Sequence, residues 1–556
     1  MTTRRTFLAG TALAATLDAG AAMAQQAGDR IRKIVLLSWP QGQNAQGYQA
    51  SQLIAQEWRK LGLEVEVRPL PWSQHIQVVW NERSRWDTTM WRMVGRSERS
   101  DPDEIVFNLF HSSTAEKGFN FIGYNNPDYD RIVVAQRQAT DQAKRKELIL
   151  QAQRTLDSDQ AQIFLVHPAQ VKAFNKNVWD EATIVNQSGI GIRNFWTFVR
   201  ATPKGAQKDM VLNASEPVLA INPLYIAGGT SSWCTELIWD RLARVGLDGL
   251  PEPWTAEKIE WVDATTVDVS IRPGQTWHDG RPLTAEDVIY SFEVPAIENK
   301  VPMYKPFVAD IARMEKTGEL KVRFVLKAPN AAFVTASLAK INIIPKHVWE
   351  PVMKDLLGKP ENAEALGNPS AVGSGPFKLV RNRGNEEIVL ERNDRHWAAP
   401  KMDRWILRIV LNPEAILGML RTGDINFLAD YGGDPDVLEK LAKDNPSIAL
   451  RQEVDIGFEY AAFNLRRAPF NDPNFRRALS VAIDRNVMVQ AAWSGYAVAS
   501  NSPVSPALKF WHDAEVDKLQ TGTQRARELL EKSGYRIVSG RLHYPMGVKE
   551  TLPPLD

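Results

Sequence analysis

The sequence predicts an α/β protein that is large enough for two or three domains or for one two-lobed body. The chain has 556 residues, and its hydrophobic content of 44% and charged content of 24% are typical of globular proteins. Residues 34–68 predict a strand, a helix and a second strand in succession, and residues 267–293 predict a strand, tight turns and a helix. Strands that alternate with helices along the chain favour an α/β fold.

The first α/β unit begins with the apolar run 34–37, which is a candidate buried strand. The apolar side chains of the helix predicted over 49–61 share one face, and Gly62 supplies a left-handed stop after it. Residues 63–68, LEVEVR, then alternate between apolar and charged side chains. This alternation indicates a half-buried strand.

The second unit shows the same kinds of signal further along the chain. Residues 267–271 alternate between apolar and polar side chains, and residues 273–280 contain Pro-Gly and Asp-Gly turns. Thr284 can cap the following helix, and Asp287 lies three residues later at the spacing of a capping box. We therefore expect a strand, a tight turn and a capped helix here.

Capping aspartates mark two further helices. Asp141 precedes a helix that is followed by the apolar strand 162–166. Asp472 precedes a helix that we expect to end at Gly495.

The beginning of the chain predicts an export signal. Residues 3–8, TRRTFL, form a twin-arginine pattern, an alanine-rich apolar segment follows, and residues 22–24, AMA, form a cleavage site. The segment is too short to span a membrane, and no later run of about 18 apolar residues predicts a membrane helix. We expect residues 1–24 to be a twin-arginine signal peptide and the remainder to be a soluble periplasmic protein. The cleavage point has no cysteine that could carry a lipid anchor.

Charge and cysteine content exclude several classes of protein. The formal net charge is +1, and removal of residues 1–24 takes away two arginines and one aspartate, which leaves a neutral chain. A nucleic-acid-binding protein usually has an excess of basic residues, so we expect no nucleic-acid partner. The single cysteine, Cys234, excludes an intrachain disulfide and a cysteine-rich zinc site. The 18 tryptophans indicate either a large core or aromatic platforms for a sugar or a peptide.

No catalytic motif is present in the sequence. The patterns H-E-x-x-H, G-x-S-x-G, G-x-x-x-x-G-K-[ST] and G-x-G-x-x-G are absent, and the eight histidines are scattered singly. We therefore expect a protein that is not an enzyme and that binds no cofactor and no metal.

The stretch 271–293, IRPGQTWHDGRPLTAEDVIYSFE, resembles the signature of the family 5 extracytoplasmic solute-binding proteins. These are the peptide- and nickel-type receptors of bacterial ABC importers. Further segments that resemble motifs of this family are 222–224 (NPL), 236–242 (ELIWDRL), 373–377 (GSGPF), 390–393 (LERN) and 463–484, which contains NDPNFRRALSVAID.

The order of these segments departs from the family. Residues of about 30–200 resemble the family's C-terminal third, but here they precede the part that resembles its beginning and middle, about 208–556. We expect a circular permutant in which the linker 201–209 joins the ancestral termini, and in which residues 34–37 lie close to 540–556. The alternative is a gene rearrangement that gives a non-folding chain, and the export signal ahead of the moved piece argues against it.

The resemblance implies a type II periplasmic-binding-protein fold of two α/β lobes with a hinge and a ligand cleft between them. Carried onto this chain, lobe I is residues 176–464, and lobe II is residues 27–175 plus 465–556. The two crossovers would lie near Lys172–Trp179 and near Phe463–Pro469. Function would be hinge closure around a ligand.

The resemblance also implies a function. It predicts a periplasmic substrate-binding receptor of an ABC importer that captures a peptide or other polar solute, with permease and ATPase subunits as partners and a monomeric state. The alternatives are an oligosaccharide receptor of the same family or, less favoured, an exported enzyme or a chaperone-like binder on the same scaffold.

Several segments hold candidate ligand-binding residues. The loop that contains Tyr225 and Trp233 reaches the cleft in the family, although Trp233 can instead pack under the loop. Tyr460 and Asn464 lie just before a predicted crossover. Phe458 and Trp493 are further candidates, although Trp493, in the last turn of a helix, can instead be core.

The segment that starts at Trp91 occupies the place where peptide-binding relatives keep an aspartate for the peptide's amino terminus. Glu98 is the nearest acidic match here, and Arg92 and Arg96 lie beside it. Arginines in a closed cleft favour a carboxylate or phosphate ligand through bidentate pairing. The alternative is a solvated basic loop.

Overall fold

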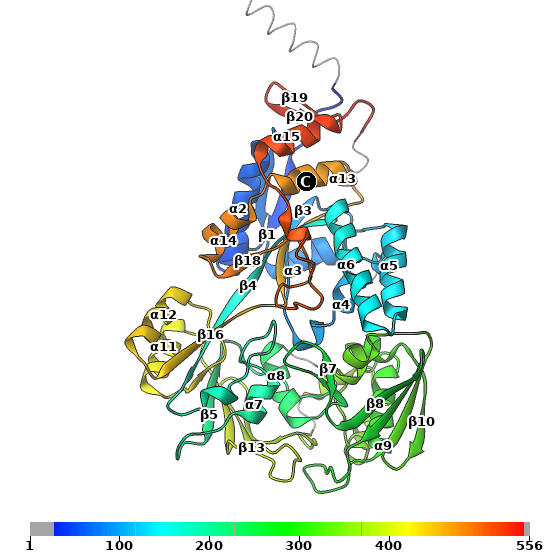
Figure 1. The fold of residues 1–556 in the computed structure, drawn as a ribbon, viewed down its shortest axis with the longest axis vertical. Helices are drawn as coiled ribbons and strands as arrows, with labels where there is room; N and C mark the ends of the chain where they lie inside the picture. Colours follow the sequence, from blue (N-terminus) through cyan, green and yellow to red (C-terminus); the bar gives the residue numbers. More distant parts are fainter. Residues whose placement is uncertain (1–26, 117, 226–227, 368–369, 550–556) are drawn as a thin grey trace, which may run out of the picture.

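The computed structural model describes residues 27–116, 118–225, 228–367, 370–549 of the chain (Figure 1). The predicted signal peptide, residues 1–24, therefore lies outside the described residues. Among the described residues, no helix combines the length and the apolar character that a membrane crossing needs.

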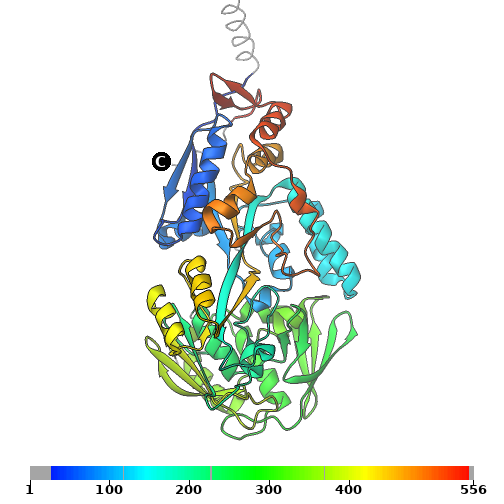
Figure 2. The ribbon, with the colours of Figure 1, turned by 60° about the vertical axis from the view of Figure 1, so that its left-hand side comes forward.

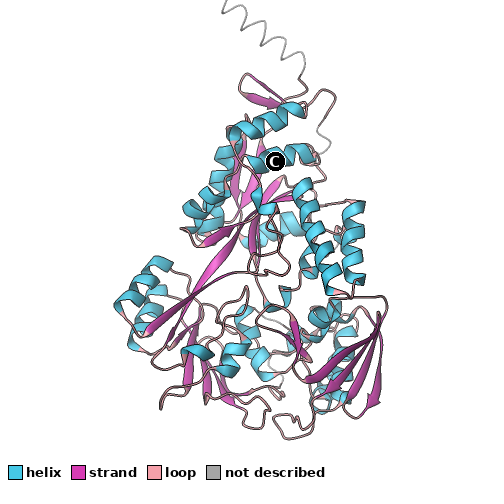
Figure 3. Cartoon of the chain, viewed as in Figure 1, coloured by secondary structure: helices cyan, strands magenta, loops and turns pink. Residues whose placement is uncertain are grey.

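The largest sheet of the described residues has twelve strands and extends from the lower into the upper part of the molecule (Figures 1 and 3). Ten of them follow one path: β12 (Phe377–Arg383), β13 (Glu387–Arg392), β14 (Arg404–Ile409), β5 (Asp209–Ala214), β15 (Phe427–Leu428), β4 (Gln162–Asn175), β17 (Phe458–Phe463), β3 (Thr88–Met93), β1 (Ile34–Ser38) and β2 (Val65–Pro69). The strands β16 (Ile448–Val454) and β18 (Ala497–Ala499) pair with β4 beside this path.

Strand β4 belongs to both ends of the molecule. Residues 162–168 of this strand pair with β17 and β18, and residues 169–175 pair with β16. Figures 1 and 2 show it as one continuous strand that passes from the upper to the lower part. The predicted strand 162–166 is therefore the first part of a longer element.

The first predicted α/β unit is confirmed. Helix α2 (Ala45–Arg59) lies between the parallel strands β1 and β2. It starts four residues before the predicted helix because the side chain of Asn44 accepts a hydrogen bond from the amide of Gly47 at 2.8 Å. Gly62 has a φ of +86°, as its role in stopping the helix requires.

The second predicted unit is also confirmed. Strand β9 (Thr266–Ile271) buries every second side chain, and α9 (Ala285–Glu293) starts with a complete capping box between Thr284 and Asp287. Strand β9 belongs to a four-stranded antiparallel sheet (Figure 3). Its other strands are β8 (Ala256–Asp263), β10 (Ile311–Gly318) and β11 (Lys321–Leu326).

The predicted helix between Asp472 and Gly495 is two helices, which corrects the prediction. Asp472 caps α13 (Pro473–Val481) as expected, but Asp484 accepts hydrogen bonds from two amides and caps a new helix, α14 (Arg485–Trp493). Asp141 caps its helix as predicted.

The remaining helices are mostly short. They are α3 (Trp72–Ile76), α4 (Asp103–Val106), α5 (Pro127–Gln138), α6 (Gln142–Asp159), α7 (Phe195–Arg200), α8 (Gly229–Ile238), α10 (Lys346–Leu357), α11 (Pro413–Thr422), α12 (Pro435–Asp444) and α15 (Thr523–Lys532). The short strand pairs are β6 (Ala243–Val245) with β7 (Pro251–Pro253), and β19 (Arg536–Val538) with β20 (Arg541–His543).

The buried apolar side chains define two lobes. One cluster contains residues from 31–166 and 456–544, and we call the part of the molecule built on it the upper lobe. Two other clusters contain residues from 173–449, and we call the part built on them the lower lobe. The chain crosses between the lobes once within β4 and once at 449–456.

The second crossing lies before the predicted position near Phe463–Pro469. Strand β17 pairs with β3, and its residues Phe458, Tyr460 and Phe463 are buried in the core of the upper lobe. The segment 456–464, which we assigned to lobe I, therefore packs with the upper lobe. An apolar strand goes to the lobe whose strands it pairs with, and its own sequence does not specify that partner.

The two ends of the described chain lie side by side. The amide of Gly28 donates to the carbonyl of Tyr544 at 2.9 Å, and the amide of Ile31 donates to the carbonyl of Leu542 at 3.0 Å. The amide of Leu542 donates to the carbonyl of Gly62 at 3.0 Å, at the end of the first α/β unit. The prediction named residues 34–37, and the hydrogen bonds to 542–544 come from residues 28–31 just before them and from Gly62. Residues 550–556 lie outside the described part.

Candidate functional site

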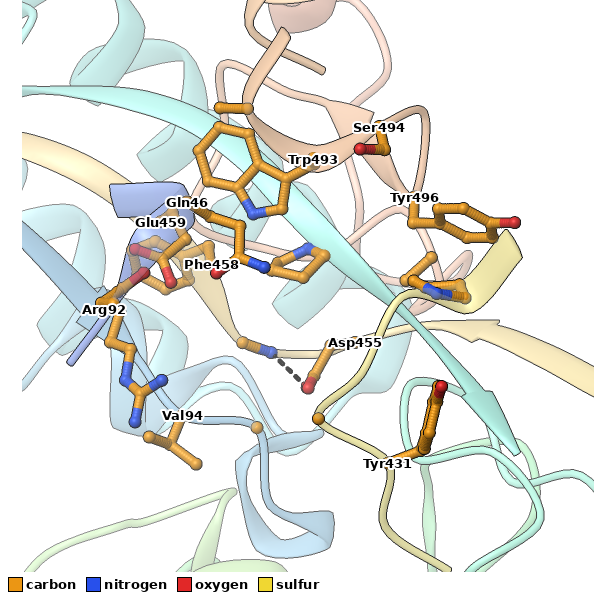
Figure 4. Close-up of a pocket in the computed structure, with 18 of the residues that line it drawn as sticks. Gln46, Arg92, Val94, Tyr431, Asp455, Phe458, Glu459, Trp493, Ser494 and Tyr496 are labelled. Carbon is orange, nitrogen blue, oxygen red and sulfur yellow. Dashed lines mark hydrogen bonds between the residues drawn. The ribbon is translucent and has the colours of Figure 1, made fainter. Parts of the chain in front are cut away.

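A cavity of about 600 Å³ lies between the two lobes, where the chain crosses (Figure 4). Its upper wall contains 92–95 at the end of β3, 457–459 at the start of β17, and residues 492–494 and 496 at the end of α14 and just after it. Its lower wall is the loop 431–435 before α12. Pro168, Ala169 and Asp455 of the crossing segments form its floor.

The upper wall carries two charged side chains on neighbouring strands. Arg92 and Glu459 are paired in the antiparallel register of β3 and β17, so both side chains lie on the cavity face of the sheet. Figure 4 shows them next to each other at one side of the cavity. The guanidinium of Arg92 forms no hydrogen bond and no ion pair with a described residue.

Glu459 is the most unusual group of the cavity. The residue is only 6% exposed, and its oxygen Oε2 has no hydrogen-bond partner among the described atoms. Burial raises the pKa of this carboxyl group to about 8, although the charge of Arg92 and a hydrogen bond with Asn44 act in the opposite direction. At neutral pH this carboxyl group is therefore mostly protonated.

The floor of the cavity is held in place by hydrogen bonds. Asp455 accepts from the amide of Gly457 at 2.8 Å and from the side chain of Gln170, which in turn accepts from Lys172. Burial lowers the pKa of Lys172 to about 7. A Cβ atom on Gly95 would lie 1.7 Å from Oδ1 of Asp455, so only glycine fits there. Both oxygens of Asp455 are thus used within the protein.

Aromatic side chains line the rest of the cavity. Phe458 and Trp493 lie on its upper wall, and Tyr431 lies on its lower wall (Figure 4). Trp493 also packs into the core of the upper lobe, so the two alternatives considered for it both apply. Such faces suit the apolar parts of a ligand or the face of a sugar ring.

The lobes contact each other on either side of the cavity. The hydroxyl of Tyr496 in the upper lobe lies 2.8 Å from Oδ1 of Asp436 and 3.0 Å from Oε1 of Glu439, both on α12 of the lower lobe. This contact stands at the edge of the cavity, which Tyr496 itself lines.

A second contact joins α4 of the upper lobe to the lower lobe. The carboxylate of Glu104 accepts from Lys340 of the lower lobe and, at 2.9 Å, from Nε of Arg99. Burial favours the neutral form of Glu104, but the charges and hydrogen bonds of Lys340 and Arg99 outweigh burial and hold its pKa below the ordinary value. A backbone hydrogen bond of 2.6 Å from Ala331 to Arg137 also links the lobes on this side.

The predicted ligand-binding residues are scattered over the structure. Phe458 and Trp493, the two further candidates, line the cavity, but of the other seven whose side chains are described only Arg92 does. Trp91 lies on the opposite face of β3, where it packs against Trp72 and Phe121 with ring centroids 5.6 and 5.1 Å away. Arg96 is exposed before a short 3₁₀ helix, Ser97–Arg99. The side chain of Glu98 lies outside the described part.

The other four predicted residues also lie away from this cavity. Tyr460 is buried in the core because it points away from the cavity face that Glu459 occupies. Asn464 is fully buried, and its side-chain amide donates to the carbonyls of Arg83 and Trp86. In the lower lobe, Tyr225 is half-buried, and Trp233 stacks under the guanidinium of Arg193 at 4.0 Å.

Sequence reasoning missed Glu459, Tyr431 and Tyr496. For Glu459 a signal existed, because it is the one charged residue in the otherwise apolar strand 458–463, FEYAAF. A lone carboxyl group in a buried strand needs a partner or a function. For the two tyrosines we find no comparable signal.

The model of the bacterial extracellular solute-binding proteins, family 5 Middle, matches residues 251–554. The oligopeptide-binding protein AppA of Bacillus subtilis is 27% identical over 337 residues, which cover 60% of this chain and 60% of that protein. The glutathione-binding protein GsiB of Pectobacterium atrosepticum is 28% identical and covers 49% of this chain and 51% of its own length. The heme-binding protein A of Haemophilus influenzae is 25% identical over 57% of this chain and 60% of that protein. The chain thus spans about half to three fifths of these relatives.

Two solved structures show the level of structural similarity. The AppA protein of Bacillus subtilis in complex with a nonapeptide has a TM-score of 0.47 and 23% identity, over 60% of this chain and 66% of that chain. NikZ of Campylobacter jejuni in complex with Ni(L-His) has a TM-score of 0.46 and 21% identity, over 60% and 64%.

Proposed function

The chain belongs to the family 5 bacterial extracellular solute-binding proteins, whose model matches more than half of it, and from this premise we propose that it is the substrate-binding receptor of an ABC importer. It captures a solute in the cavity between its lobes by hinge closure and performs no chemistry on it. It acts as a monomer in the periplasm after export by the twin-arginine route. Permease and ATPase subunits of the importer are its partners.

The observation that carries this proposal is the cavity at the crossing segments. Its volume of about 600 Å³ falls within the range of small-molecule sites. Both of its walls and its floor come from different parts of the two lobes, so closure assembles it and opening takes it apart. The contacts of Glu104 and Tyr496 with the lower lobe are those that a hinge motion would break.

The ligand that suits the cavity is a peptide or another polar solute. Arg92 is a free cation on the wall and can pair with a carboxylate. Trp493 and Tyr431 offer aromatic faces to the less polar parts of the solute. Glutathione and oligopeptides, which the names of two relatives give as ligands, have both kinds of group.

We also propose that the chain is a circular permutant of this family. The pairing of residues 28–31 with 542–544 supports this proposal, because it brings together the segments that are continuous in relatives. The linker supports it as well, because Lys204 and Pro203 lie against Val178 and Trp179 and lead directly into β5. Permutation keeps all contacts of a fold and changes only the order in which the chain visits them.

Thermal unfolding with a panel of peptides, oligosaccharides and opines tests the receptor function, and native mass spectrometry of the protein purified from its own periplasm identifies what it carries. A ligand at 100 times its Kd should stabilise the chain by about 2.7 kcal/mol. The variant Ala169→Phe fills the floor of the cavity and should lose this stabilisation, whereas Ala365→Phe on the exposed surface of the lower lobe should keep it. The proposal fails if no ligand stabilises the chain or if both variants respond equally.

A further inference from the structure

We propose that the carboxyl group of Glu459 is a subsite for a cationic nitrogen, so that the solute captured here carries a protonated amine or a guanidinium group. This inference rests on the proposed receptor function and narrows its ligand class. It places the selecting carboxylate on β17, not in the segment after Trp91 where the sequence resemblance put it.

The position of Glu459 in the fold supports the first part of the proposal, that its carboxyl group is available to a ligand. Its neighbours on β17, Phe458 and Tyr460, are buried in the core, and Glu459 is the charged residue between them, which lines the cavity together with Phe458. Its oxygen Oε2 has no partner among the described atoms. A buried polar group without a partner lowers the stability of a fold, so the group has no evident structural role. A ligand that supplies a donor would remove this penalty.

The groups around Glu459 support the second part of the proposal, that the ligand group is positively charged. Arg92 on β3 is the neighbouring cation, but it lies outside ion-pair distance of Glu459 and remains free for another partner. Asn44, which precedes α2, is the hydrogen-bonding neighbour of the carboxyl group. The other titratable groups that line the cavity are Tyr431, Asp434, Asp455 and Tyr496. No lysine or histidine is among these lining residues, so Arg92, which forms no ion pair with Glu459, is the one cationic side chain among the described residues that line the cavity.

Binding of a cation would be coupled to release of a proton. Burial raises the pKa of Glu459 to about 8, so before a ligand binds most of this group is the neutral acid at pH 7. When the ammonium group of a ligand arrives, the O–H bond of the carboxyl group breaks, the proton passes to the buffer, and an ion pair forms. At pH 7 about 0.9 proton should be released per ligand, and affinity should fall about ninefold between pH 7 and pH 6.

Four probes test the inference on the full chain by thermal shift and calorimetry. They are a tripeptide mixture without lysine, arginine and histidine, the same mixture with acetylated amino termini, spermidine, and maltohexaose. We expect the free tripeptides or spermidine to bind, and we expect the acetylated tripeptides and maltohexaose not to bind. Calorimetry in phosphate and in Tris at pH 7 should then count the released proton, because the two buffers take up protons with different heats.

The variant Glu459→Gln keeps the shape of the side chain but cannot ionise. It should bind the amine probes at least tenfold more weakly, release no proton, and lose the pH dependence between pH 6 and pH 7. Glu257→Gln, an exposed residue of β8, is the matched control and should behave as the unaltered chain does. If Glu459→Gln does not fold, the proton count on the unaltered chain still decides the question.

The failure of this inference is distinguishable from failure of the receptor function. Equal binding of the acetylated tripeptides, or binding of maltohexaose, would overturn the amine subsite and leave the receptor function standing. Binding of an amine without proton release would also overturn it. If none of the four probes binds, the amine subsite is overturned, and the wider panel of peptides, oligosaccharides and opines decides the receptor function.

Discussion

Replacing Lys340 by methionine should loosen the contact between the lobes without unfolding either lobe. The ammonium group of Lys340 donates to Glu104 across the interface, and the side chains of the two residues are 10% and 20% exposed. Methionine keeps an apolar stem beside Phe307, over which the ammonium group of Lys340 lies at 4.1 Å. The change therefore removes one charged hydrogen bond and little packing.

The free-energy cost of Lys340→Met depends on the hydrogen bond that Glu104 keeps in the variant. Removal of one partner from a fully buried ion pair costs about 3–5 kcal/mol. In the variant Glu104 keeps the hydrogen bond of 2.9 Å from Arg99, and the pair is partly exposed. We therefore expect a cost of about 1–2 kcal/mol, toward the lower end of the roughly 1.5–3 kcal/mol of a hydrogen bond to a charged group. This cost lowers the ratio of closed to open molecules by a factor of about 5 to 30.

Small-angle X-ray scattering of the ligand-free protein measures this effect as an increase in the radius of gyration. Ligand affinity should fall by no more than the same factor, because binding must then restore the closed state. Lys316→Met is the control, since Lys316 pairs with Glu286 and Glu319 within the lower lobe. An unchanged radius and affinity for Lys340→Met, or an equal effect of Lys316→Met, would refute the reasoning.

Three further outcomes follow. Tyr496→Phe should weaken the contact on the other side of the cleft by about 0.5–1.5 kcal/mol, because the hydrogen bonds of its hydroxyl group with Asp436 and Glu439 are lost. If this contact and that of Lys340 are independent, the effects of the two substitutions on the radius of gyration should add, and a lack of additivity would contradict their independence. The pKa of Lys172 is lowered to about 7, so between pH 7 and about 10.4 the unfolded chain holds a proton that the folded chain lacks. The free energy of unfolding of the unaltered chain, measured in urea relative to that of Lys172→Met, should therefore rise by up to about 1.4 kcal/mol per pH unit. A difference that does not change with pH would contradict this prediction. A rearranged chain that starts at 208, joins 549 to 27 and ends at 201 should fold and bind the same ligands, with an unfolding free energy within about 2 kcal/mol of the original, and a failure to fold would argue against the permutation.

Features set by neighbouring residues could be predicted from the sequence. The capping box of Thr284 and Asp287, the caps at Asp141 and Asp472, and the stop at Gly62 all appear as expected. Each depends on a hydrogen bond or a dihedral angle within a few residues, so the sequence contains all the information it needs.

Features set by distant residues could not be predicted in the same way. Lys340 and Glu104 are 236 positions apart, and Tyr496 and Asp436 are 60 apart. In the strand FEYAAF, the register against β3 decides whether Glu459 or Tyr460 faces the cavity, and a shift by one residue would exchange them. We expected Tyr460 to contact ligand because it lies just before a predicted crossover, whereas Glu459, paired with Arg92, is the residue that lines the cavity.

The meeting of residues 28–31 with 542–544 has a consequence for synthesis on the ribosome. The lower lobe is drawn from one uninterrupted stretch, 173–449, and all of its core has emerged before the upper lobe can find its last partners. Domains generally fold as units as they emerge, so the nascent chain should carry a finished lower lobe and an unfinished upper lobe until translation nears its end. A chain terminated shortly before residue 541 would then be a folded half tied to an exposed, aggregation-prone remainder.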